Sequence, residues 1–181
     1  YNFSSNPDLQ YGLGLGLDFG RKESATGALA GMGSIGSKVE YGAFLSYALD
    51  RHWQLSSVLR YGSGEKNQGA VATFGANYNM DIAPKWRLAW GVSTTWANSP
   101  YMQSYFGVSA SQSTASGHAV YSPNSGMRDV GSSLNLSYQV SPRTVVTGGL
   151  KATNLVGAAK KSPVVTSPQS VSGSLSVGYA F

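Results

Sequence analysis

Seven charged side chains alternate with apolar residues in the strand-like segments of this sequence, and they are the residues best placed to do chemistry. They are Asp18, Lys38, Glu40, Arg60, Arg87, Asp129 and Lys151. An isolated charge in an interior of low dielectric is costly, so these groups must pair with one another or meet water. Four are basic and three acidic. Two interpretations stay open: a polar network that plugs the interior, or a narrow channel that slightly prefers anions.

The sequence offers little for catalysis. His52 and His118 are its only histidines, and it has no cysteine. A Ser-His-acid triad would need an orienting acid in contact with the histidine, and serine is so common here that one near His118 carries no information. No carboxylate pair and no group of His, Asp and Glu has the spacing of metal ligands. We therefore expect no catalytic residues, no metal and no cofactor.

The charge composition excludes a nucleic-acid partner and an ordinary soluble domain. The net charge of +5 is modest. The basic doublets Arg21-Lys22 and Lys160-Lys161 stand apart, whereas nucleic-acid binding needs a basic stripe with interleaved aromatics. Charged residues make up 12% of the chain, against about 25% in soluble domains. Much of the surface must therefore be hidden from water, yet no run of about 18 apolar residues could form a spanning helix.

The elements that carry these residues read as β-strands. Large apolar and small or polar residues alternate in eight segments, while no segment shows convincing helical periodicity. Each segment has the length of a tilted strand that crosses a bilayer, with aromatic residues near its ends, as at membrane interfaces. The segments are 9–19, 39–49, 53–61, 70–80, 86–96, 130–140, 144–154 and 171–181.

The connections between the strands alternate in length. Short turns at NPD, LDRH, DIAPK and SPR alternate with loops at 20–38, 62–69, 97–128 and 155–169. This pattern predicts a single all-β domain over 1–181, an antiparallel transmembrane β-barrel of the bacterial outer membrane with its C-terminus at the periplasmic side. A soluble sandwich or lipocalin would carry more charge on one face.

Both ends of the sequence bear on this topology. Residues 1–3 read as the tail of a descending strand, so we expect N-terminal strands to be missing and about ten to twelve strands in the intact protein. The last strand carries Leu175, Val177, Tyr179 and Phe181 at alternate positions. This pattern resembles the signal that the barrel-assembly machinery recognises. A barrel in the outer membrane is surrounded by lipids and lipopolysaccharide, so we expect these as its partners too.

The long extracellular loop at about 97–128 has an unusual aromatic content. It contains Tyr101, Met102, Tyr105 and Phe106. Full exposure of these large side chains to water would be unfavourable. Two interpretations stay open. The loop folds over or into the barrel mouth and buries these side chains, or it presents them as a contact surface for a partner or ligand.

Several motifs carry a resemblance to a known family. WANSPYMQSYFGVSASQSTASG, the later RDVG and the terminal GYAF resemble the MipA/OmpV family, as do YNFSSNPDLQYGLGLGLDFGRKES and GAFLSYAL. The likeness covers essentially the whole chain. One departure is VGAAKKSP, where the family has an acidic GDAADSP, so that Lys160 and Lys161 invert the charge of that loop.

The resemblance implies a non-enzymatic outer-membrane scaffold that tethers peptidoglycan-remodelling enzymes, with a murein transglycosylase and a murein synthase as partners. The residues themselves leave two alternatives open. The protein could be a narrow channel or small-solute binder that uses the lumen charges, or a surface adhesin or receptor that acts through the long loops.

Overall fold

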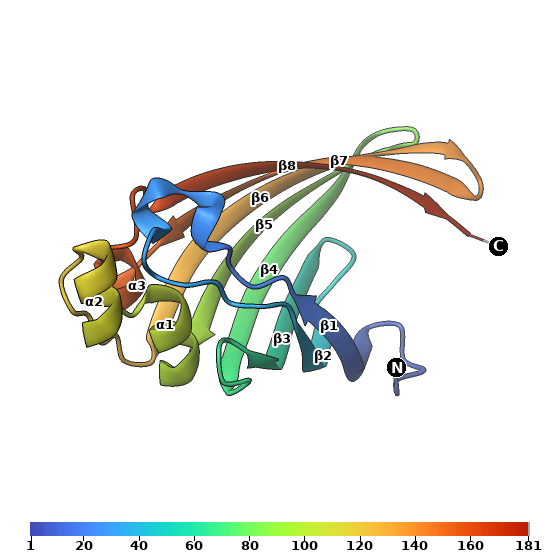
Figure 1. The fold of residues 1–181 in the computed structure, drawn as a ribbon. Helices are drawn as coiled ribbons and strands as arrows, with labels where there is room; N and C mark the ends of the chain where they lie inside the picture. The colour runs from blue at the N-terminus through green and yellow to red at the C-terminus, as the bar shows by residue number, and fades with distance from the viewer. Residues whose placement is uncertain (181) are drawn as a thin grey trace.

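The computed structural model describes residues 1–180. They form one eight-stranded antiparallel sheet in which every strand pairs with its neighbours in the sequence. The sheet curves like half of a barrel, and the long loops gather at one end of it (Figure 1). The strands are β1 (Leu9–Asp18), β2 (Lys38–Ala48), β3 (Trp53–Ser63), β4 (Gly69–Ala83), β5 (Trp86–Ala97), β6 (Gly126–Ser141), β7 (Thr144–Leu155) and β8 (Gln169–Tyr179). The predicted all-β antiparallel fold is confirmed.

Short helices occupy the loops, where the sequence showed no helical periodicity. They are η1 (Glu23–Ala25), η2 (Gly27–Leu29), α1 (Ser99–Phe106), α2 (Ala110–Ser116) and α3 (Gly157–Lys160). At one or two turns each, they are too short for a period of 3.6 residues to emerge. None of the helices in the described part of the chain is long and apolar enough to span a membrane.

The two faces of the sheet have opposite chemistry because successive side chains point to opposite sides of a strand. The register places Leu15 opposite Tyr41, and Tyr41 opposite Tyr61, on the convex face. These side chains are exposed, Leu15 to 77%. On the concave face Gly16 stands opposite Glu40, which is 2% exposed. The convex face is thus an apolar surface open to its surroundings.

The edges of the sheet are formed by β1 and β8, which stand at opposite ends of the strand order. Residues 1–3, expected to be the tail of a strand, do run antiparallel to β1. Asn2 forms an isolated bridge with Gly12, and the Leu13 amide donates to the Tyr1 carbonyl at 2.9 Å.

The buried core lies at the loop end rather than along the strands. One apolar cluster contains Leu29, Met32, Val108 and Val164. A second contains Val71, Ala97, Met102 and Ala159, against which partly buried residues of α1 and α3 pack. The loops are therefore held together as a packed cap, which we define as residues 20–37, 62–68, 98–125 and 156–168.

Candidate functional site at the capped end of the sheet

Helix α1 is fastened to the sheet by the side chain of Asn98, its N-cap residue. The side-chain oxygen Oδ1 of Asn98 accepts from the backbone amides of Tyr101 at 3.0 Å and Ala70 at 2.9 Å. Its side-chain amide donates to the Gln68 carbonyl at 2.9 Å. An asparagine that caps a helix satisfies one of its free N–H groups, and here it also joins α1 to the start of β4. Pro100, within the first turn, suits a helix start.

Met102 anchors α1 in the apolar cluster beneath it. Its side chain is 0% exposed and lies among Val71, Ala97 and Ala159, which come from β4, β5 and α3. The other loop residues singled out in the sequence, Tyr101, Tyr105 and Phe106, are partly buried. Of the two interpretations of this loop, the geometry matches the one in which it folds over the end of the sheet.

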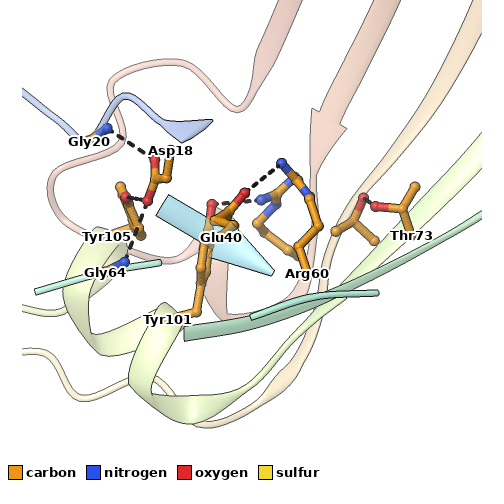
Figure 2. A network of polar contacts seen from close by, with 10 residues as sticks. Asp18, Gly20, Glu40, Arg60, Gly64, Thr73, Tyr101 and Tyr105 are labelled. Atoms are coloured by element: carbon orange, nitrogen blue, oxygen red, sulfur yellow. Dashed lines mark hydrogen bonds and ion pairs between the residues drawn. The ribbon is translucent and has the colours of Figure 1, made fainter. Parts of the chain in front are cut away.

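Tyr105 connects α1 to the last residue of β1. Its hydroxyl donates a hydrogen bond to Asp18, whose carboxylate also accepts from the Gly20 amide at 3.0 Å and the Gly64 amide at 3.5 Å. Figure 2 shows Asp18 between these three donors. Burial and the bond to the carboxylate both raise the pKa of Tyr105, because each disfavours a second negative charge at this place. Asp18 thereby ties three segments of the cap to the sheet.

Tyr101 lies beside Tyr105, and its hydroxyl contacts strand β6 rather than β1. The two rings are 4.6 Å apart between centroids. Arg128 donates from Nη1 to the Tyr101 hydroxyl at 2.7 Å and from Nε to Asp129 at 2.5 Å. Burial raises the pKa of Tyr101, so that its hydroxyl stays neutral as it accepts from the guanidinium.

Glu40 and Arg60 form a second polar contact deeper in the concave face (Figure 2). The Arg60 Nη1 atom lies 3.2 Å from a Glu40 carboxylate oxygen. The Glu40 side chain is 3% exposed and that of Arg60 is 42% exposed. The carboxylate is thus buried, while the guanidinium that compensates it still reaches solvent.

The remaining charged residues of the predicted lumen set are not part of this arrangement. Arg87 pairs with Asp81 at 2.9 Å, at the opposite end of the sheet and exposed. In the described part of the chain, Lys38 and Lys151 form no ion pair. The seven side chains therefore divide into separate local contacts instead of one network.

Sequence reasoning missed the contacts that join the loops to one another. Gln112 donates to the Met32 carbonyl at 2.7 Å, and the His118 ring is 2.8 Å from the Ala28 carbonyl. Arg21 Nη1 donates to the carbonyl of Tyr105 at 3.0 Å. The partners in these contacts are backbone carbonyl groups. Every residue has one, so residue types do not predict such contacts. Within residues 1–180, no cluster of His, Cys, Asp and Glu could hold a metal ion.

Comparison with known proteins places the chain in a family. The family model described as "MltA-interacting protein MipA" matches residues 1–181, the whole chain. The chain belongs to the MipA family. A search of curated proteins finds no significant match. Among solved structures, a crystal structure of Neisserial surface protein A (NspA) is similar at 12% identity, covering 94% of this chain and 92% of that chain with a TM-score of 0.34.

Membership of the MipA family confirms the resemblance found in the sequence, and the structure explains the most specific motif physically. The YFGVS stretch ends α1 and starts α2. Val108 exchanges two backbone hydrogen bonds with Tyr121, at 2.8 and 3.0 Å. Ser109 then caps α2 and forms a capping box with Gln112. The motif of this MipA family member therefore connects α1 to α2 and pairs that connection with the segment at Tyr121.

Proposed function

We propose that this MipA family chain is a non-enzymatic outer-membrane β-barrel protein that tethers a peptidoglycan-remodelling enzyme at its periplasmic turns. One observation carries the proposal: the loop end of the sheet is closed by a packed cap, while the turn end is open and charged. The family description names an interaction with MltA, which supports a lytic transglycosylase as the partner. A packed cap over the concave face disfavours a wide channel.

The apolar convex face supports a place in the membrane. Leu15, Leu17 and Leu175 are each at least 60% exposed, and a soluble monomer rarely exposes so large a continuous apolar surface. Lipid tails and the lipid part of lipopolysaccharide would cover it. The outward positions Leu175, Val177 and Tyr179 of β8 are the proposed signal for the barrel-assembly machinery. Phe181, the last residue of this proposed signal, lies outside the described residues.

The turn end offers two hollows to a protein partner. One, of about 660 Å³, is lined by residues that include Asp81, Lys85, Trp86 and Arg87. The other, of about 560 Å³, contains Asp50 and Arg51 and shares Arg87 with the first. The rim of these hollows is exposed to water and carries charges of both signs. Such a rim favours a polar and reversible contact with a partner whose own charges are arranged to complement it.

Backbone amides hold the turn at 49–52, beside the second of these hollows, in shape. The amides of His52 and Trp53 donate to the Asp50 carboxylate at 2.7 and 2.8 Å. These bonds lower the pKa of Asp50, because they stabilise its charged form. The turn therefore presents Arg51 from a fixed backbone.

A binding measurement with charge-reversal variants tests the scaffold. Purified MltA-type transglycosylase should bind the full chain in detergent, and R51E with K85E should weaken this binding at least about tenfold by reversing the rim charge. The matched control is K160E with K161E, which reverses two charges in the cap and should bind as the parent does. Equal binding by an unrelated barrel, or by the turn variant, would contradict the proposal.

The orientation can be tested separately because the chain has no cysteine. A single cysteine introduced by Lys160→Cys, at the capped end, should react with a membrane-impermeant maleimide on intact cells. His52→Cys, in a turn, should react only after the outer membrane is permeabilised. The opposite labelling pattern would place the turns outside the cell and refute the periplasmic scaffold.

A further inference from the structure

A cavity of about 370 Å³, open to solvent rather than enclosed, lies between the cap and the concave face of the sheet, separate from the turn-end hollows. Its volume is within the usual range of small-molecule sites, about 300–1,000 Å³. Apolar and aromatic side chains from α1, the cap loops and β7 make most of its lining: Leu29, Tyr101, Tyr105, Phe106, Leu155, Val164 and Val165. The cavity therefore suits a ligand with an apolar ring.

Charge in this cavity is unbalanced. Arg21, Arg128 and Asp129 are its charged lining residues. Asp129 is already paired with Arg128, which leaves Arg21 as the cation that forms no ion pair within residues 1–180. Glu65 attracts Arg21 only over a longer distance. The lining residues thus carry one positive charge in excess, while the nearby Asp18 carboxylate lies behind Tyr105 and is already bound by the Tyr105 hydroxyl and two backbone amides.

The backbone of Arg21 is fixed by hydrogen bonds, while its guanidinium has a donor without a hydrogen-bond partner. Its backbone exchanges hydrogen bonds with Ile35 at 3.0 and 2.7 Å, so the residue cannot swing away freely. Its Nη1 atom bonds to the Tyr105 carbonyl, but its buried Nε atom has no hydrogen-bond partner. Burial lowers the pKa of Arg21, because a partly desolvated cation without a carboxylate is destabilised. An anion at the cavity would compensate this charge.

We propose that this cavity binds a small monoanion that joins a carboxylate to an apolar ring, with the carboxylate on Arg21. The guanidinium can donate to a carboxylate from its Nη atoms, because its Nε atom is buried out of reach of a ligand. The ring lies among Phe106, Leu29 and Val164, where aromatic and aliphatic contacts favour it. Asp129 repels a second negative charge, so the site prefers monoanions to dianions. This assignment goes beyond the scaffold function and does not depend on it.

Binding of naphthoate to the full chain in detergent tests the assignment. We expect saturable binding and at least about tenfold weaker binding of the neutral analogue naphthalenemethanol, which lacks the charge-assisted bond. Arg21→Gln should weaken naphthoate binding by a similar factor. The matched control is Lys22→Gln, which removes the same charge from an exposed neighbour that does not line the cavity. That variant should bind as the parent does.

A second variant tests the cavity without changing any charge. Val165→Trp fills the space beside the proposed ring position and should abolish naphthoate binding. This variant tests the proposal even if Arg21→Gln fails to fold. Four results would overturn the proposal: no saturable naphthoate binding, equal binding of the alcohol, equal losses in Arg21→Gln and Lys22→Gln, or full binding by Val165→Trp.

Discussion

Tyr105 donates its hydroxyl hydrogen bond to Asp18, a residue 87 positions away in the sequence. The contact joins the middle of the cap to the end of β1, and the Gly64 amide reaches the same carboxylate from a further cap segment. A single carboxylate thus binds segments of three loops over the concave face. The cap should loosen as a unit when this contact is lost.

Tyr105→Phe should raise hydrogen exchange across α1. The variant keeps the ring but removes a bond to a charged group, which contributes about 1.5–3 kcal/mol. The free energy of local opening of the α1 amides should fall by about that amount. Tyr41→Phe is the control, since Tyr41 is 66% exposed on the convex face. Unchanged α1 protection in Tyr105→Phe would show that the cap does not depend on this bond.

Alkaline pH should release the cap before it disrupts the sheet. The pKa of Tyr105 is raised above its ordinary value, so the docked cap favours the neutral phenol. A raised pKa stabilises the docked state fully below the ordinary tyrosine pKa of about 10, and this contribution is lost as the pH rises further. Limited proteolysis of residues 98–125 against pH should show cleavage beginning above that value. In Tyr105→Phe the onset should lose this dependence; the same pH onset in both proteins would assign it to another group.

Met102→Ala should destabilise the cap by about 2–5 kcal/mol, the usual cost of a cavity left by a buried methionine. Met102 is 0% exposed, whereas Met127 is 42% exposed. Met127→Ala is therefore a matched control with a small expected effect. Hydrogen exchange of α1 and α3 measures both variants. Equal effects would mean that the packing under α1 does not hold the cap.

The strands could be predicted from sequence because alternation is a local signal. Leu15 and Gly16 already show which face each will occupy, and pairing with β2 only repeats that pattern. Cap contacts are different in kind: Asp18 and Tyr105 each look ordinary, and their meeting depends on the packing of loops far apart in the chain. The helix start at Asn98-Ser99-Pro100 was a readable capping signal. It was missed because the helix that follows is too short to show a period.

The Glu40–Arg60 pair should respond asymmetrically to substitution. Arg60→Met leaves a buried carboxylate without its ion-pair partner, and breaking such a pair costs about 3–5 kcal/mol. Glu40→Gln leaves a guanidinium whose side chain is 42% exposed and can be solvated, so we expect about 1 kcal/mol or less. The free energy of unfolding in detergent, from denaturant titration, measures both.

The double variant Glu40→Gln with Arg60→Met separates the two causes. If the penalty of Arg60→Met comes from the unpaired carboxylate, removing that charge should restore most of the lost stability, because no buried ion is left. The double variant should then be more stable than Arg60→Met alone. Additive losses would instead mean that Arg60 stabilises the sheet through the packing of its aliphatic stem, since that contribution does not depend on Glu40.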